Sequence, residues 1–134
     1  MVVKCIKLQE NNPVLEKNGW DNVEGHLTLL KEYVVLAIED DRAGDGMRWL
    51  LICDDLSEEL PSKFPYYIPE CYFETVDNTP SKYWIKKGSM TAFAAFVENR
   101  YFYFDLSEDD QKSQEAYMKY RKLLYEEAGF ESAI

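Results

Sequence analysis

Residues that usually carry catalysis are scarce in this chain. Of its 134 residues only His26 is a histidine, whereas acid-base catalysis near neutral pH most often uses that side chain with a second titratable group. The sequence contains neither G-x-G-x-x-G nor G-x-x-x-x-G-K-[ST], the glycine-rich patterns of loops that hold nucleotide phosphates. We therefore predict that the protein is not an enzyme and holds no cofactor.

Cysteine and long apolar runs are also scarce. Cys5, Cys53 and Cys71 form no C-x-x-C pair, so we expect neither a disulfide framework nor a zinc site with ordinary ligand spacing. The first residues alternate and soon reach a turn-forming segment at 11–13, without the apolar run of a signal peptide. No stretch approaches the roughly 20 apolar residues of a membrane-spanning helix. These features favour a reducing cytoplasm.

Basic residues are outnumbered by acidic residues. The chain has 25 Asp and Glu against 15 Lys and Arg, which gives a net charge of −10. A field of this sign repels nucleic acid and anionic membranes and speeds the encounter with basic proteins, although acidity can also serve solubility alone. Ten Tyr, seven Phe and three Trp supply more rings than a small core needs, and rings anchor protein interfaces. We expect a basic protein partner, with no direct contact to nucleic acid or membrane.

Strand patterns predict a small curled antiparallel sheet in a single α+β domain that spans residues 1–134. Apolar runs at 33–38 and 47–53, separated by a polar loop with two glycines, predict a hairpin. Further strands are predicted at 2–8, 71–76, 83–85 and 101–104. Prolines at 61, 65 and 69 exclude a helix and a central strand across 60–69. This order is typical of an SH3-like or partly open barrel.

A long C-terminal helix is predicted over residues 108–127, packed on the sheet. Ser107 and Asp110, three residues apart, have the pattern of an N-cap, and Gly129 can end the helix. Arg121 is expected to lie mostly outside the buried face. That face is expected to carry Tyr117, Tyr120 and Leu124, with Ala116 and Leu123 beside them. A shorter helical pattern spans residues 93–97.

Catalytic readings of the sequence are weaker. Cys53 or Cys71 could act as a nucleophile with His26 and an Asp, but both cysteines lie in strand-like runs, where buried and inert thiols are more common. An EF-hand register that starts at Asp41 places Ile52 where a bidentate Glu is required. We therefore interpret the loop as a solvated hairpin turn.

Two alternative functions remain open. A ring-lined pocket between the sheet and the last helix could bind a small molecule or a nucleotide. Metal-dependent phosphoryl transfer would need three carboxylates brought together by the fold. Its ligands would be Asp54, Asp55 and Asp77.

Acidic and aromatic residues are interleaved along the middle of the chain. Carboxylates can pair with Arg and set the association rate, while tyrosines provide rigid contact area. The alternative is that the rings belong to the core and the acids to the solvated face above it. We predict a partner-binding surface composed of Asp40, Asp41, Asp45, Asp54, Asp55, Glu58, Glu59, Tyr66, Tyr67 and Glu70.

Residues 30–127 resemble several small acidic bacterial immunity proteins. The resemblance lies in the segments Tyr33–Leu36, Leu50–Asp55, Phe64–Pro69, Phe73–Asp77 and Ser81–Trp84, and in the Tyr- and Glu-rich segment 101–127. Immunity proteins of this kind neutralise a cognate toxin, often a basic nuclease, by covering its active site or substrate surface. Phage-encoded inhibitors of bacterial defence systems share the size, acidity and aromatic content. The resemblance implies a stoichiometric inhibitor of a basic, nucleic-acid-acting protein, and it leaves both origins open.

Overall fold

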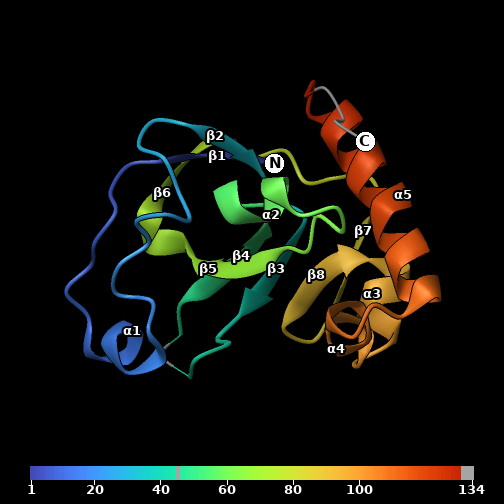
Figure 1. Cartoon of the computed structure of the whole chain (residues 1–134), viewed down its shortest axis with the longest axis horizontal. Coiled ribbons are helices and arrows are strands. Elements are labelled where there is room, and N and C mark those ends of the chain that lie inside the picture. Colours follow the sequence, from blue (N-terminus) through green and yellow to red (C-terminus); the bar gives the residue numbers. More distant parts are fainter. Residues whose placement is uncertain (45, 131–134) are drawn as a thin grey trace.

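Two antiparallel sheets and a long C-terminal helix form the α+β fold of the chain (Figure 1). The computed structural model describes residues 1–44 and 46–130. The smaller sheet has the strand order β2-β1-β6, and the larger sheet has the order β5-β4-β3-β8-β7. The strands are β1 (Val2–Cys5), β2 (Glu32–Val34), β3 (Ala37–Asp40), β4 (Arg48–Ile52), β5 (Tyr66–Pro69), β6 (Phe73–Asp77), β7 (Trp84–Lys87) and β8 (Met90–Phe93).

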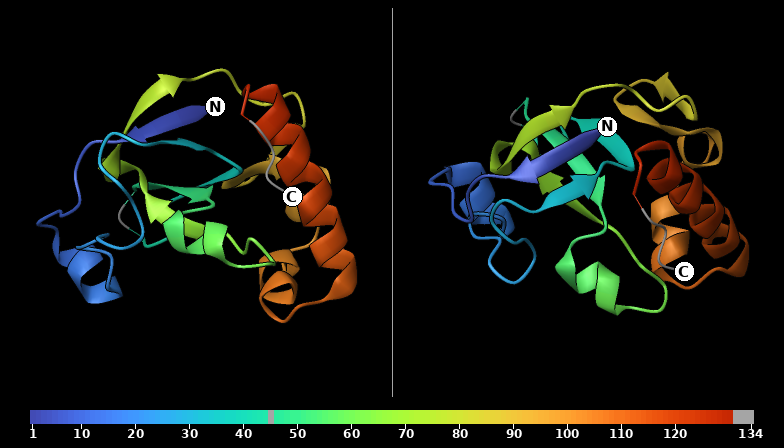
Figure 2. Two further views of the ribbon diagram at one scale, coloured as in Figure 1. Left: turned by 45° about the horizontal axis from the view of Figure 1, so that its top comes forward. Right: turned by 90° about the horizontal axis from the view of Figure 1, so that it is seen from above.

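The helices lie at the margins of the two sheets. The longest, α5 (Gln111–Glu127), runs along one side of the molecule, and the two helices that precede it in the chain lie beside its first turns (Figure 2). The prediction of a long C-terminal helix is confirmed. The shorter helices are α1 (Pro13–Asn18), α2 (Asp55–Glu59), the 3-10 turn η1 (Glu70–Tyr72), α3 (Ala94–Glu98) and α4 (Phe102–Ser107).

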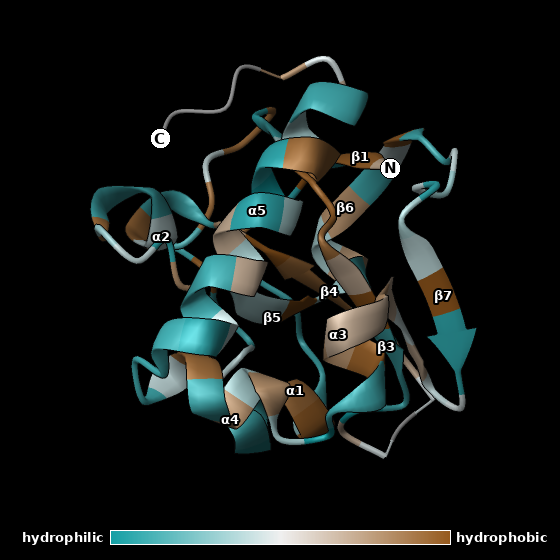
Figure 3. Cartoon of the chain, turned by 90° about the vertical axis from the view of Figure 1, so that its right-hand side faces the viewer, coloured by the Kyte–Doolittle hydropathy of each residue, from teal (hydrophilic) through white to brown (hydrophobic). Residues whose placement is uncertain are grey.

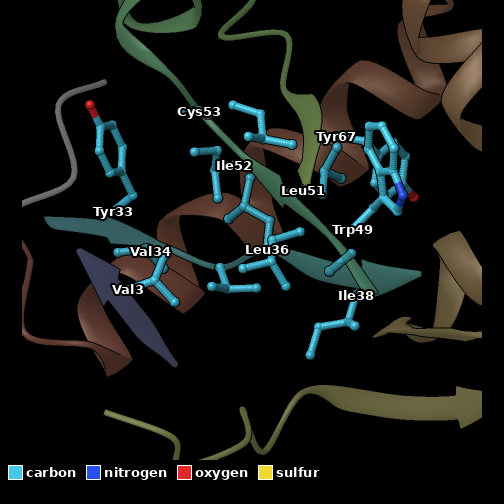
Figure 4. Packing of buried hydrophobic residues seen from close by; sticks show 14 of the residues in the cluster. Val3, Tyr33, Val34, Leu36, Ile38, Trp49, Leu51, Ile52, Cys53 and Tyr67 are labelled. Atoms are coloured by element: carbon cyan, nitrogen blue, oxygen red, sulfur yellow. The ribbon is translucent and has the colours of Figure 1, made fainter. Parts of the chain in front are cut away.

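The predicted hairpin is confirmed as β3 and β4, with Ala37 opposite Leu51 and Asp40 opposite Arg48. The apolar run at 33–38 does not form one strand, however. Tyr33 and Val34 are the last residues of β2 in the smaller sheet, and Ala37 and Ile38 are the first residues of β3 in the larger sheet. All six residues are buried because the run passes between the two sheets and contacts both of their apolar faces (Figure 4).

The sheets are open, so of the two expected forms, an SH3-like or a partly open barrel, the closed SH3-like one is not formed. β2 and β6 are the edges of the smaller sheet, and β5 and β7 are the edges of the larger one. The α+β class itself is confirmed. The chain passes from one sheet to the other at Val35 and Leu36, and among residues 1–44 and 46–130 no strand pairing joins the two sheets.

The segment from 60 to 104 combines confirmed and wrong predictions. β5 is a strand but an edge strand, which agrees with the exclusion of a central strand there. α3 confirms the helical pattern near 93–97. The strand predicted at 101–104 is wrong, because Tyr101 is the N-cap of α4 and the other three residues belong to that helix. Phe102 and Leu106 lie one helical turn apart and are both buried, whereas Phe104 faces outward.

The boundaries and buried face of α5 differ in part from the prediction. Its N-cap is Asp110, whose carboxylate accepts hydrogen bonds from the backbone N and the Oγ of Ser113, at 3.0 and 2.8 Å. Ser107 ends α4 instead. Tyr117 and Leu124 are buried as predicted, but Arg121 is buried too, with 1% of its surface exposed. The sequence pattern placed that cation in solvent, and the residues that hold it inside the protein are described below.

The turn-rich segment near the start of the chain contains a helix that the sequence analysis missed. α1 begins after Asn12, whose side-chain oxygen accepts a hydrogen bond from the backbone N of Val14 at 2.9 Å. Pro13 occupies the first turn, where its missing N–H leaves no bond unmade. Gly19 follows the helix with φ of +77°, a left-handed conformation that glycine adopts without strain.

Candidate functional site

The predicted acidic and aromatic strip is divided between the two ends of the β3-β4-β5 region. Asp40 lies opposite Arg48 at one end of β4, and Tyr66 lies opposite Ile52 at the other end. A strand rises by about 3.3 Å per residue, so these ends are about 13 Å apart. The predicted residues therefore form two separate groups.

At the first end, cations of the chain itself neutralise the predicted carboxylates. Nε of Arg48 donates a hydrogen bond to Oε2 of Glu70 at 2.9 Å, and Nζ of Lys86 lies 3.8 Å from Oδ2 of Asp40. Ion pairs this exposed contribute little to stability. They do, however, reduce the negative field that the sequence analysis assigned to these residues.

Two other predicted acids lie in a turn and at a helix end. Asp41 is exposed, and its Oδ1 accepts a hydrogen bond from the backbone N of Gly46 at 2.6 Å, which confirms the interpretation of this segment as a hairpin turn. Glu59 ends α2 and is exposed. Asp45 lies outside the described residues.

Asp54 is fully buried, which removes it from the predicted partner-binding surface. It caps α2: its Oδ1 accepts hydrogen bonds from the backbone N and the Oγ of Ser57, at 2.8 and 2.9 Å. Its Oδ2 lies 2.7 Å from Nδ1 of His26, whose ring contacts Trp20 and Tyr66. The carboxylate therefore joins the loop around residue 26 to α2 and cannot reach a partner from the folded state.

Asp55, the next residue, collects three hydrogen bonds from the segment 28–33. Its carboxylate accepts from Oγ1 of Thr28 at 2.6 Å, from Nζ of Lys31 at 2.7 Å and from the hydroxyl of Tyr33 at 3.0 Å. Partial burial opposes ionisation of Asp55, but the hydrogen bonds from these residues outweigh it and lower the pKa of the carboxyl. Asp55 thus fastens a loop to α2.

Glu58 holds the buried cation of α5. Nη2 of Arg121 donates to Oε1 of Glu58 at 2.9 Å, and the guanidinium lies 4.2 Å from the ring centroid of Tyr125. Nε of Arg121 lies 3.3 Å from Sγ of Cys53. Burial raises the pKa of the Cys53 thiol in spite of the adjacent guanidinium. The cysteine is consequently a protonated, buried group rather than a nucleophile.

The two predicted tyrosines of β5 differ in exposure. Tyr67 is 4% exposed, with the guanidinium carbon of Arg42 at 4.0 Å from its ring centroid and the ring of Tyr103 at 5.2 Å. Tyr66 is half-buried and packs edge-on against Phe64. Tyr67 is therefore core, which corrects its assignment to the binding surface, because the ring packs into the layer that α4 covers.

The catalytic alternative with cysteine loses its geometric support. The partner of His26 is Asp54, whereas Cys53 contacts Arg121 and Tyr117. Cys71 is the remaining thiol near a surface. Burial, together with the nearby carboxylate of Glu10, raises the pKa of Cys71 to about 11.

The metal alternative required Asp54, Asp55 and Asp77 to converge. Asp77 ends β6 in the smaller sheet, where its Oδ1 accepts a hydrogen bond from the backbone N of Thr79; the other two begin α2 and use their oxygens internally. Across residues 1–44 and 46–130, no group of three or more His, Cys, Asp or Glu is arranged to hold a metal ion.

A hollow lies where the small-molecule alternative placed its pocket, between the sheet and the last helix. It has a volume of about 250 Å³, just below the range of about 300–1,000 Å³ usual for ligand sites. Rings line it from both sides: Tyr33, Tyr125 and Phe130. A larger groove, of about 740 Å³, lies elsewhere, between the two sheets.

Exposed rings and unpaired carboxylates do gather on one surface, around α4. We define the α4 surface as the exposed and partly exposed side chains of residues 98–115. Tyr101 is 54% exposed and Phe104 is 61% exposed; Tyr101 is the N-cap of α4, and Phe104 lies three residues further, in its first turn. Figure 3 shows α4 beside the hydrophilic first half of α5.

The α4 surface is also strongly acidic. Its six carboxylates and two cations give the segment a net charge of −4, and within the described parts of the chain none of these carboxylates forms a salt bridge. Arg100 places its guanidinium carbon 4.7 Å from the ring centroid of Tyr101 instead. The acids are Glu98, Asp105, Glu108, Asp109, Asp110 and Glu115.

The sequence analysis missed this surface because it assigned residues 101–104 to a strand. A strand would place Phe102 and Phe104 on the same face, so the pattern of four rings indicated a core element. The helical alternative was present in the sequence: Phe102 and Leu106 are spaced by four residues, and Asp105 and the following acids are typical of an exposed helix end.

Comparisons with known proteins give no relative for this chain. No family model, no curated protein and no solved structure matches it. Separately, none of the helices in 1–44 and 46–130 is long and apolar enough to cross a membrane.

Proposed function

We propose that this chain is a stoichiometric inhibitor that binds a basic, nucleic-acid-acting protein through the α4 surface. The observation that carries the proposal is the combination of two largely exposed rings, Tyr101 and Phe104, with six carboxylates that form no salt bridge among the described residues. Rings at the centre and charges at the rim are the usual anatomy of a protein interface. The proposal keeps the function expected from the sequence but moves its site.

The electrostatics of the α4 surface support a basic partner. Asp105, Glu108, Asp109 and Asp110 fall within six residues, and like charges this close repel one another. Glu108 and Asp109 lie directly before the N-cap of α5, whose dipole offsets part of this repulsion. A partner that brings Lys or Arg to this surface relieves the remaining repulsion, which makes association favourable and salt-sensitive.

The rings give the same surface its contact area. Phe104 has no polar group, so its exposure to water is unfavourable in the free protein and is relieved by burial in a complex. Tyr101 stacks with Arg100 and can supply both area and a hydroxyl. A basic nucleic-acid-binding face, which already accepts phosphates and stacked bases, is complementary to carboxylates and rings of this kind.

The toxin-immunity and phage counter-defence roles are both consistent with this mechanism, because in each the inhibitor occupies the substrate surface of its target. The proposal includes a reducing cytoplasm, in which Cys5, Cys53 and Cys71 stay free thiols as they are in the structure. The genes adjacent to this one distinguish the two roles: a toxin fragment indicates immunity, and a phage early operon indicates counter-defence.

The experiment captures the partner from the organism that encodes the chain and measures the affinity at about 50 mM and about 300 mM salt. We expect a basic protein, an affinity that falls at least tenfold between the two salt concentrations, and loss of its nucleic-acid-directed activity at a one-to-one ratio. Glu108→Lys with Asp109→Lys should abolish binding. Glu16→Lys with Glu126→Lys is the matched control, because it changes the net charge equally at exposed acids outside the α4 surface.

A partner that is not basic, or an affinity that salt leaves unchanged, contradicts the proposal. Equal loss of binding in the two double variants would show that only the total charge matters and would remove the α4 surface as the site. Phe104→Ala tests the apolar part separately, with Ile85→Ala, at 42% exposure in the native chain, as its control.

A further inference from the structure

β6 is an edge of the smaller sheet that carries neither proline nor lysine. It has five residues, and Glu74 to Asp77 are all exposed. Natural proteins block free edges with prolines, charged side chains, β-bulges or very short strands; β6 has a bulge near Val76, and its only charges are acidic. The other three edges show such features: β5 ends at Pro69 and follows Pro65, β7 carries Lys86 and Lys87, and β2 has only three residues.

The register shows which backbone groups of β6 are free. The backbone N of Ile6 donates to the carbonyl of Tyr72 at 2.9 Å, so Glu74, two residues further along β6, also faces β1 with its backbone groups. Thr75 lies between these bonding positions, and its N–H and C=O point away from β1. A bulge near Val76 ends the regular pairing and leaves Thr75 within the regular part of the strand.

A groove of about 740 Å³ runs beside this edge. Thr75 and Val76 line one side of it, and Trp84 and Thr91 of the larger sheet line the other. Its volume is in the range of sites that hold ligands. An added strand needs such space, since every second side chain of the strand points to the same face.

We propose that an extended, basic segment of a partner protein adds to β6 as the fourth strand of the smaller sheet, with its side chains in this groove. The charge of the edge selects the occupant. Asp77 is exposed and forms no salt bridge among the described residues. Glu74 forms a salt bridge with Lys4. A second copy of this chain would bring two acidic edges together and is therefore disfavoured. Lysine or arginine on an added strand would instead pair with Glu74 and Asp77. The inference is independent of the α4 surface.

The test uses a synthetic peptide of eight alternating lysine and valine residues with blocked ends, and it measures amide hydrogen exchange of the full chain by NMR. We expect saturating peptide to slow the exchange of the Thr75 amide at least tenfold and to leave the Glu74 amide nearly unchanged, because Glu74 already faces β1. The same peptide with N-methyl groups on alternate residues keeps its charge but cannot pair, and it should give no protection.

Two variants complete the test. Thr75→Pro removes the outward N–H without removing a bond to β1, and edge strands tolerate proline; it should abolish the protection pattern along β6, whereas Thr75→Val should retain it. If Thr75→Pro does not fold, the N-methylated peptide decides alone. The double variant Glu108→Lys with Asp109→Lys should bind the peptide at β6 as the native chain does, which separates this inference from the proposed function.

Three outcomes would overturn the inference. Equal protection by the N-methylated peptide would show charge attraction without strand pairing. Protection confined to another edge or to the α4 surface would place the peptide elsewhere. Protection of Thr75 that appears without peptide and grows with protein concentration would identify a second copy of the chain as the occupant.

Discussion

The guanidinium of Arg121, which is 1% exposed, lies 2.9 Å from Oε1 of Glu58 and thereby joins α5 to α2. Removing the carboxylate leaves the guanidinium buried without its counterion, because arginine does not lose its proton in proteins. We expect Glu58→Gln to lower the free energy of unfolding by about 2–3 kcal/mol in urea denaturation. Arg121→Met should be less harmful, since it removes the charge and keeps apolar volume.

Glu126→Gln is the control for this pair, because Glu126 is exposed on the same helix and forms no salt bridge within the described chain. This substitution should change the free energy of unfolding by no more than about 0.5 kcal/mol. An equally small effect of Glu58→Gln would show that the ion pair does not hold α5 in place.

The buried cap Asp54 gives a second prediction. Asp54→Ala removes the cap of α2 and leaves His26 and the hydroxyl of Ser57 without their acceptor, so we expect a loss of about 2–3 kcal/mol in the free energy of unfolding. Asp110→Ala at the exposed cap of α5 should have a smaller effect. Denaturation curves that rank the two variants in the opposite order would contradict the structural role assigned to Asp54.

Acidification should weaken the attachment of the loop 28–33 to α2. Burial raises and hydrogen bonds lower the pKa of Asp55, with a net lowering. A carboxyl whose pKa is lower in the folded than in the unfolded state, where it is about 3.9, stabilises the fold above that value and loses this effect as pH falls through the folded pKa. The stability difference between the native chain and Asp55→Asn should thus be constant down to about pH 5 and shrink between about pH 4 and pH 2.

Urea titrations at a series of pH values measure this difference directly. The comparison with Asp55→Asn removes the general effect of acid on a chain of net charge −10. A gap that persists unchanged at about pH 2 would mean that the three hydrogen bonds to Asp55 do not favour its ionised form.

The three thiols should react slowly in the native protein. Burial and the backbone bond to Lys7 act in opposite directions on the pKa of Cys5, with a net increase, and burial raises the pKa of Cys71 to about 11. The thiolate is the reactive species, so a disulfide reagent at about pH 8 should modify the native chain far more slowly than free cysteine, whose pKa is about 8.5. In denaturant all three should react at the rate of free cysteine. Rapid modification of one thiol without unfolding would contradict the assignment.

The sequence was sufficient for the elements whose local pattern agrees with their final environment. The hairpin of β3 and β4 has continuous apolar runs on both sides of a glycine-bearing loop, and α5 has an apolar stripe that Gly129 ends. Local patterns predicted the wrong element where the same aromatic and charged residues are compatible with either a strand or a helix. The four aromatic residues 101–104 favour a strand by propensity, yet the burial of Phe102 with Leu106 makes them a helix.

The predicted partner-binding surface is divided in the structure for a different reason. Its residues are close in sequence, but the length of β4 separates them into two groups, and their partners come from distant segments. Glu58 pairs with Arg121, 63 residues away, and Glu70 pairs with Arg48. Spacing along the chain carries no information about such partners. The net charge remains a correct clue to an acidic surface, but which acids stay unpaired depends on the tertiary structure.

The pairing of β1 with β6 has a consequence for how the chain is made. β1 spans residues 2–5, and its partner β6 spans residues 73–77, so more than half of the 134 residues must leave the ribosome before the smaller sheet is complete. Until then β1 can pair only with β2, at residues 32–34, and its other edge is open to other nascent chains. Closing a loop this long makes the pairing of β1 with β6 a slow, entropy-limited step in folding, and the hairpin of β3 and β4, which closes over seven residues, can form before it.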